Sequence, residues 1–122
     1  METEQLLKMA WLAREDAYAW KSGTKVGCAI ECEGGFVTGW NVEGLWMTSI
    51  HAEVLATAQL AGLGVKGKRI AIVSDTSFFT PCGACLDWLV QFCDWDAEVI
   101  IQNRQTTSQY ILGEMIPNYP RR

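Results

Sequence analysis

The chain contains no apolar run long enough to cross a membrane. A spanning helix needs roughly 18 or more consecutive apolar residues, and no segment of the sequence approaches that length. The N-terminal segment METEQLLKMA is acidic, whereas a secretory signal peptide begins with basic residues. We therefore expect a cytoplasmic protein that does not act at a membrane.

Basic residues are few and are not clustered. Ten Lys and Arg residues stand against 14 Asp and Glu residues, which gives a formal net charge of −4. A protein that binds a polynucleotide gathers basic side chains into a groove that neutralises the phosphates. The sequence therefore argues against a nucleic-acid partner and favours a small, weakly charged substrate.

Internal repeats, low-complexity tracts and linkers are also absent. The chain is therefore predicted to form a single domain, residues 1–122, and its 49% of apolar residues can supply a buried core. The five cysteines are an odd number, which argues against a disulfide framework. Cys28, Cys32 and Cys93 lie within apolar stretches and are expected to be buried hydrophobic side chains without a chemical role.

Segments rich in β-forming residues predict the strands. Residues 26–32 and 36–41 are separated by Glu33-Gly34-Gly35, which is typical of a β-hairpin. Residues 69–74 (RIAIVS) form a short apolar run, as expected for a buried central strand. The remaining expected elements are a strand over residues 97–102 and a short terminal element over residues 110–116, ended by Pro117.

Three helices are expected around these strands. The first is predicted because apolar residues recur at helical spacing over residues 6–18, and it is expected to end near Ser22-Gly23. The second covers residues 51–63, with Thr48 and Ser49 as candidate caps, and the third runs from Thr80 as cap and Pro81 to Cys93. A central sheet needs helices over both hydrophobic faces, so the predicted fold class is α/β, a three-layer α/β/α sandwich with a mixed central sheet.

Two short motifs at helix starts carry the chemistry. They are His51-Ala52-Glu53 and Pro81-Cys82-Gly83-Ala84-Cys85. Helix N-termini that converge on one point should lower thiol pKa values and favour a metal with anionic ligands. Cys82, Cys85 and the single histidine, His51, would supply three ligands and leave a fourth tetrahedral position for water, which is the catalytic arrangement of zinc.

Each motif alone has an ordinary explanation. A histidine near a helix start is more often a cap or a surface residue, and Cys-x-x-Cys can be a redox dithiol like that of thioredoxin. Thioredoxin-like motifs usually have Trp before the first cysteine, whereas Pro81 precedes Cys82 here. A non-enzymatic zinc or redox module therefore stays open as a distant alternative, and zinc content would distinguish it.

Taken together, the motifs resemble those of the cytidine deaminase family. His-x-Glu followed about 30 residues later by Pro-Cys-x-x-Cys is the signature of zinc deaminases. The resemblance extends over residues 25–119: Val26-Gly27-Cys28-Ala29 is similar to the family's Val-Gly-Ala-Ala, Asn41-Val42-Glu43 matches its Asn-x-Glu, and Met115-Ile116-Pro117 is similar to its Leu-Leu-Pro.

This resemblance implies a fold, an activity and a set of roles. The chain would be a cytidine-deaminase-like hydrolase that converts cytidine or deoxycytidine to uridine or deoxyuridine and ammonia. His51, Cys82 and Cys85 would hold one Zn²⁺ per chain, which lowers the pKa of its bound water to about 7. Glu53 would act as general base and then as general acid, by passing protons to N3 of cytosine and to the departing amino group.

The resemblance also implies how the substrate is held. Asn41 and Glu43 would hydrogen-bond the ribose hydroxyls, and the backbone of Ala52 would touch the pyrimidine. Thr24 stands where the family usually has an aromatic residue that packs on the substrate. Further departures are Leu86-Asp87 in place of Arg-Gln and the absence of an Asn-Ala-Ser-Tyr-Gly run from residues 44–50. A deaminase for another cytosine-bearing nucleoside, such as blasticidin S, therefore stays open as the second hypothesis.

Assembly into a homotetramer is a further expectation from the resemblance, since family members of this size complete each active site with neighbouring subunits. Apolar surface supports this expectation. A small monomer would not comfortably bury Trp88 and Phe92 on the third predicted helix together with Trp46 in a loop near the site.

Overall fold

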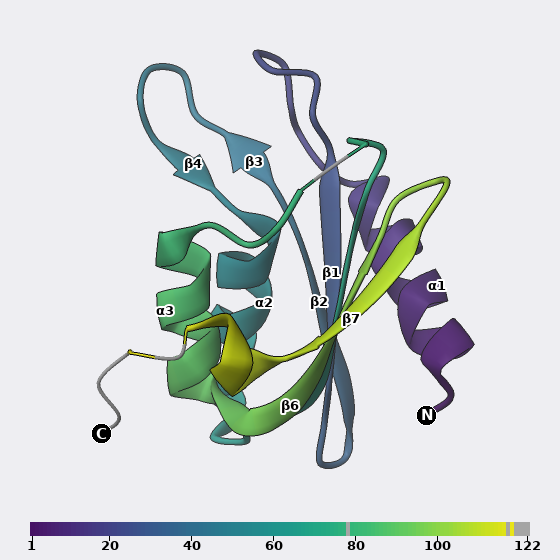
Figure 1. The fold of residues 1–122 in the computed structure, drawn as a ribbon. Helices are drawn as coiled ribbons and strands as arrows, with labels where there is room; N and C mark the ends of the chain where they lie inside the picture. Colours follow the sequence, from purple (N-terminus) through teal and green to yellow (C-terminus); the bar gives the residue numbers. More distant parts are fainter. Residues whose placement is uncertain (78, 117, 119–122) are drawn as a thin grey trace.

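A five-stranded mixed sheet forms the centre of the computed structural model, which describes residues 1–77, 79–116 and 118 (Figure 1). The strands are ordered β2-β1-β5-β6-β7, with β5 and β6 parallel and the other neighbours antiparallel. In chain order the elements are α1 (Thr3–Arg14), β1 (Val26–Cys32), β2 (Gly35–Trp40), β3 (Val42–Glu43), β4 (Ser49–Ile50), α2 (Ala52–Leu63), β5 (Gly67–Ser74), α3 (Gly83–Phe92), β6 (Cys93–Gln102), β7 (Thr107–Ile111) and the 3₁₀ turn η1 (Leu112–Met115).

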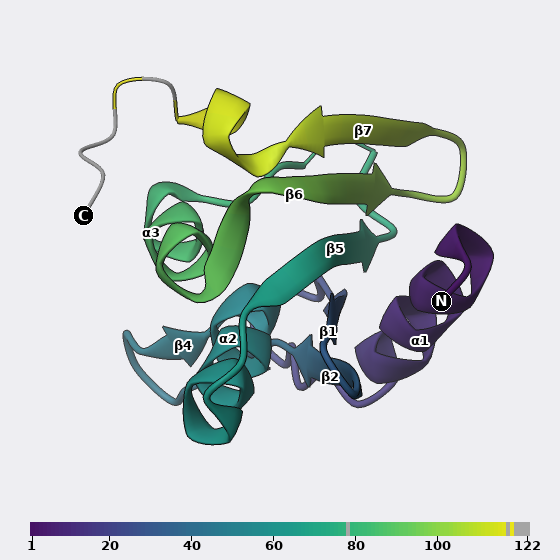
Figure 2. The same ribbon diagram turned by 90° about the horizontal axis from the view of Figure 1, so that it is seen from below.

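Helices cover both faces of this sheet, α1 on one side and α2 with α3 on the other (Figure 2). Successive strand residues point to opposite faces, so Ala71 and Val73 of β5 pack with α1, whereas Ile70 and Ile72 pack beneath α2 and α3. Each face therefore has its own apolar cluster. The predicted three-layer α/β/α sandwich with a mixed central sheet is confirmed, and the RIAIVS segment is its middle strand.

The first helix is shorter than predicted, because it ends at Arg14 instead of near Ser22. The chain leaves α1 through tight turns and is then captured by backbone hydrogen bonds: the amide of Tyr18 donates to the carbonyl of Asn41, and the amide of Glu43 donates to the carbonyl of Tyr18. Tyr18 thus pairs with Val42 in a parallel bridge. These partners lie far away in the sequence, so helical spacing alone could not locate the helix end.

The predicted caps of the two later helices are wrong. His51 occupies the N-cap position of α2, and Ser49 lies in the short strand β4. Cys82, not Thr80, occupies the N-cap position of α3, so Pro81 precedes the helix. Neither His51 nor Cys82 makes a side-chain capping hydrogen bond, so both side chains are available for another purpose.

The C-terminal part contains one strand more than the terminal element we predicted. Strand β6 begins at Cys93, directly after α3, and not at residue 97. The element expected over residues 110–116 divides into the edge strand β7 and the turn η1, while Pro117 lies outside the described residues. None of the helices in the described ranges has the length and apolar character that a bilayer crossing requires.

Gly39 allows α2 to lie directly on β2. A Cβ atom at this position would clash with the carbonyl oxygen of Ala52 and would lie 2.7 Å from the amide nitrogen of Ala56. The N-terminal turn of α2, with His51 and Glu53, therefore owes its position to this close approach.

We predict that Gly39→Ala lowers the free energy of unfolding by about 1–3 kcal/mol, because the helix must move away from the sheet. Gly62→Ala is the matched control: its Cβ atom would meet nothing within 4 Å, and alanine favours a helix by up to about 1 kcal/mol. Urea unfolding measures both variants. An unchanged midpoint for Gly39→Ala would contradict the packing described here.

Candidate metal centre and substrate cavity

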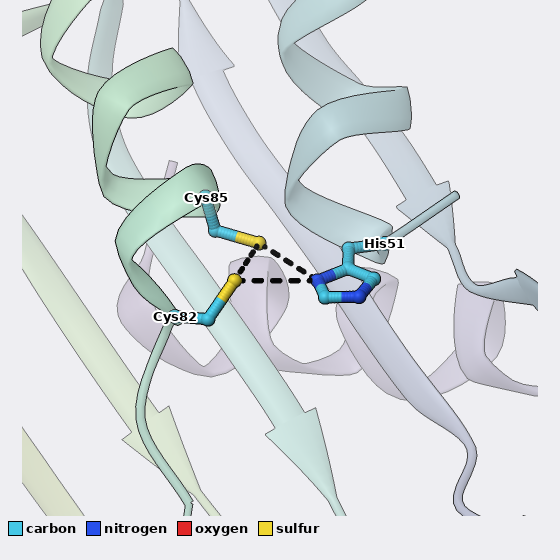
Figure 3. A group of neighbouring side chains, drawn as sticks. All are labelled: His51, Cys82 and Cys85. Carbon is cyan, nitrogen blue, oxygen red and sulfur yellow. Dashed lines mark hydrogen bonds between the residues drawn. The ribbon is translucent and has the colours of Figure 1, made fainter. Parts of the chain in front are cut away.

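Three side chains with metal-binding atoms meet where α2 and α3 begin (Figure 3). His51 Nδ1 lies 3.2 Å from Cys85 Sγ and 3.5 Å from Cys82 Sγ, and the two sulfur atoms are 3.5 Å apart. His51 and Cys82 are the N-cap residues of their helices, and Cys85 follows in the first turn of α3. The structure thus brings together the three residues that the sequence nominated as ligands.

The separations of 3.2–3.5 Å are close to those between the ligands of a tetrahedral zinc site. Zn–S bonds of about 2.3 Å and Zn–N bonds of about 2.0–2.1 Å place tetrahedral ligand atoms roughly 3.5–3.8 Å apart. Among the described residues, no fourth His, Cys, Asp or Glu joins the cluster. Two thiols and one imidazole, with one position left over, are the donor set of a catalytic zinc site and not of a structural one.

Burial acts against thiolate formation at Cys85 in the protein alone. It raises the pKa of the Cys85 thiol, and the nearby carboxylate of Glu53 raises this pKa further. Our expectation that the two helix ends would lower the thiol pKa is therefore wrong for this residue. A bound divalent cation reverses this balance, because its charge compensates a thiolate that burial would otherwise disfavour.

Glu53 is a buried carboxylic acid beside this cluster. It lies in the first turn of α2, and only 5% of its surface is exposed. Burial raises its pKa, while its own backbone amide, the charge of His51 and a hydrogen bond with the Cys85 thiol act in the opposite direction. A carboxyl group with a raised pKa is suited both to accept and to return a proton near neutral pH.

An open cavity of about 260 Å³ extends from the cluster toward the β3–β4 hairpin. Every predicted site residue except Cys85 lines it, and Cys85 is buried. No Lys or Arg side chain of the described residues contributes to its walls, whereas Glu43 and Glu53 both do. The cavity therefore offers hydrogen-bonding groups and negative charge, with no cation to receive a phosphate.

The side chains of Asn41 and Glu43 already have partners within the chain. The Asn41 amide accepts a hydrogen bond from the backbone of Val26 and donates one to the carbonyl oxygen of Thr24, both at 2.8 Å. The Glu43 carboxylate accepts hydrogen bonds from Lys21 and Ser22. Bonding to Ser22, through its hydroxyl and then its amide, lowers the pKa of Glu43 and keeps it charged.

The sequence did not identify Ser22 and Phe79 as part of this cavity, although both line it. The sequence predicts a helix end near Ser22-Gly23, but Gly23 has a φ of +75° and belongs to a tight turn. A Ser-Gly pair is itself a turn signal, so this position could have been recognised as a loop. Thr24, one of the departures from the family pattern, also lines the cavity, whereas Leu86 packs against the core.

Comparison with known proteins agrees with this geometry. Residues 1–102 match the family model described as the cytidine and deoxycytidylate deaminase zinc-binding region. The cytidine deaminase of Halalkalibacterium halodurans is 33% identical over 122 residues, covering 96% of this chain and 92% of that protein. The cytidine deaminase of Sporosarcina psychrophila is 34% identical over 107 residues, 84% of this chain and 79% of that protein.

Solved structures of cytidine deaminases share the fold of this chain. The crystal structure of cytidine deaminase from Burkholderia pseudomallei superposes with a TM-score of 0.90 at 30% identity, covering 97% of this chain and 98% of that one. Cytidine deaminase from Mycobacterium tuberculosis gives a TM-score of 0.81 at 26% identity, covering 97% and 96%. With the His-Cys-Cys cluster, the buried glutamate and these matches together, the chain belongs to the cytidine and deoxycytidylate deaminase family.

Proposed function

We propose that the protein is a zinc-dependent deaminase of free cytidine and deoxycytidine. The observation that carries this proposal is the position of the His51, Cys82 and Cys85 ligand atoms beside the buried carboxyl group of Glu53, at the wall of one cavity. A redox dithiol would need neither the histidine nor the buried acid. The reaction is hydrolysis: cytidine and water give uridine and ammonia.

His51, Cys82 and Cys85 would hold one Zn²⁺ per chain. When bound in such an open site, zinc lowers the pKa of a coordinated water to about 7. His51 would serve as a neutral ligand through Nδ1, the atom that faces both sulfurs.

Glu53 would move the protons of the reaction. As a general base it accepts a proton from the attacking water and passes it to N3 of the cytosine ring while C4 is attacked. It then takes the remaining proton from the hydroxyl group added at C4 and delivers it to the amino group, so that the C4=O bond forms, the C4–N bond breaks, and ammonia leaves. Its burial supports this role, because a raised pKa reduces the difference in proton affinity between Glu53 and its partners.

The cavity favours a nucleoside over a nucleotide. Recognition of a phosphate normally uses Arg, Lys or a group of backbone amides, and no basic side chain of the described residues lines this cavity. Two carboxylates in its walls, Glu43 and Glu53, would repel a phosphate further. Asn41 and Glu43 would bind the sugar hydroxyls, and Ala52 would contact the pyrimidine through its backbone.

We also propose that the chain assembles into a homotetramer. The tip of the β3–β4 hairpin exposes three consecutive apolar side chains, Leu45, Trp46 and Met47, with exposed fractions of 69%, 78% and 96%. Contiguous apolar surface of this kind marks an interface, and Trp88 is also partly exposed. Light scattering at micromolar concentration is expected to give the mass of four chains, and a monomer would overturn the proposal.

Glu53→Ala is predicted to abolish deamination without releasing the metal. The side chain is not a ligand, so zinc content and the thermal unfolding temperature should stay close to those of the wild type. Loss of general acid–base catalysis should lower kcat by roughly 10²- to 10⁴-fold. Glu33→Ala, which removes an exposed carboxylate from the β1–β2 turn, is the control and should keep full activity. A Glu53→Ala variant with one third of wild-type turnover would contradict the assigned role.

The sugar-binding role predicts that cytidine is a far better substrate than free cytosine. A site built to bind a hydroxyl leaves its polar groups unpaired when that hydroxyl is missing. Glu43→Ala should lower kcat/KM for cytidine by roughly ten- to a hundredfold and affect cytosine little. The measurement is a panel of cytidine, deoxycytidine, cytosine, cytidine monophosphate and blasticidin S. Equal kcat/KM for cytosine and cytidine would exclude the sugar role, and a preference for blasticidin S would support the alternative substrate.

A further inference from the structure

We propose that Ser22 is a positioning residue for Glu43, and that the segment from Lys21 to Thr24 holds this carboxylate ready for one sugar hydroxyl. The inference rests on the proposed function, in which Glu43 contacts the sugar. Ser22 lies outside the cluster of candidate metal ligands and outside both the His-x-Glu and the Pro-Cys-x-x-Cys motifs.

Three donors of this segment converge on the Glu43 carboxylate. The backbone amides of Lys21 and Ser22 donate to Oε1 at 2.9 and 3.0 Å, and the Ser22 hydroxyl donates to Oε2 at 2.5 Å. The two backbone donors fix one oxygen, and the hydroxyl fixes the rotation of the group by holding the other. Ser22 thus supplies the single side-chain contact among the three.

The segment has anchors of its own besides its hydrogen bonds to the Glu43 side chain. Trp20 Nε1 donates to the backbone carbonyls of Glu43 and Gly44 at 3.2 and 3.3 Å, and Tyr18 pairs with Val42 in the parallel bridge. The amide of Gly23 donates to the carbonyl of Ala19 at 2.9 Å, which closes the turn. A segment anchored in this way can orient a carboxylate instead of merely following it.

Ser22 also connects the two residues proposed to bind the sugar. Its hydroxyl oxygen accepts a hydrogen bond from the amide of Thr24 at 3.0 Å, and the carbonyl of Thr24 accepts one from Asn41 Nδ2 at 2.8 Å. Glu43, Ser22, Thr24 and Asn41 therefore form one continuous hydrogen-bonded chain along the cavity wall. A shift of Ser22 would therefore alter the positions of both Glu43 and Asn41.

These three hydrogen bonds limit how many further hydrogen bonds the Glu43 carboxylate can accept. A carboxylate offers about four lone-pair positions, and three are occupied by Lys21 and Ser22. One position remains for a ligand, on the Oε2 atom that the Ser22 hydroxyl orients, because Oε1 already accepts both backbone amides. The same bonds lower the pKa of Glu43, so the group is charged when the substrate arrives.

A purely structural role for Ser22 makes a different forecast from a positioning role. If Ser22 only closed a turn, its loss would cost stability and would change substrate use equally with or without the Glu43 carboxylate. If it acts through Glu43, its effect must disappear once that carboxylate is removed. A double-mutant cycle separates the two cases.

The experiment compares the zinc-loaded wild type with Ser22→Ala, Glu43→Ala and the double variant, using cytidine as substrate. Ser22→Ala is expected to lower kcat/KM about three- to tenfold, mainly by raising KM, because two of three hydrogen bonds remain. In the Glu43→Ala background, the same substitution should change kcat/KM less than about twofold. Ser22→Thr, which keeps the hydroxyl, should return to within about twofold of the wild type, and Ser108→Ala, on the exposed strand β7, is the control.

Equal losses in both backgrounds, or no loss in either, would overturn the role of Ser22 and leave the proposed function intact. A wild type that does not deaminate cytidine would instead overturn the proposed function, and this inference with it. Thermal unfolding identifies variants that do not fold. Should Ser22→Ala be one of them, the cycle is repeated with Ser22→Cys, which keeps the size and offers only a weak donor, and the same outcomes decide.

Discussion

Two helices begin side by side, and their N-cap residues, His51 and Cys82, point their side chains at each other instead of back at their own helices. The arrangement requires α2 to lie against β2 without an intervening side chain, which Gly39 permits. It also requires α3 to pack beside α2 over the same face of the sheet, as in Figure 2. The ligand cluster, the buried glutamate and the cavity all follow from where these two helices start.

Charge explains why this junction suits a metal. Cys85 and Glu53 are both buried, and burial raises the pKa of each, so a protein without a cation disfavours two anions here. A divalent cation would supply the missing positive charge, and two helix N-termini would add to it. At the far end of the cavity Glu43 is held as an anion by hydrogen bonds from its own chain. With such a cation bound, negative charge would be compensated locally at both ends, and no Lys or Arg side chain in the described walls is available to attract a phosphate.

The sequence was sufficient to predict the layers of the fold and the three side chains that meet as candidate metal ligands, His51, Cys82 and Cys85. Ligand chemistry depends on residue type, and Cys-x-x-Cys at a helix start sets the distance between Cys82 and Cys85 locally. What it could not predict depends on distant contacts. The end of α1 is determined by backbone bonds from Tyr18 to the segment around Val42, and the bonds between Ser22 and Glu43 join residues 21 positions apart. The helix caps were missed because the ordinary preference for Ser and Thr at N-caps pointed to neighbouring Ser and Thr residues. The N-cap positions are instead occupied by the candidate ligands His51 and Cys82.

We expect His51, Cys82 and Cys85 to bind one zinc ion in an open tetrahedral site. Elemental analysis of protein purified without chelator, combined with anomalous diffraction at the zinc edge, tests it most directly. One zinc per chain is expected, with the anomalous peak between His51 Nδ1 and the two sulfur atoms and no fourth protein ligand. Protein that contains no zinc after growth in zinc-supplemented medium, with Cys82 and Cys85 joined as a disulfide, would contradict it.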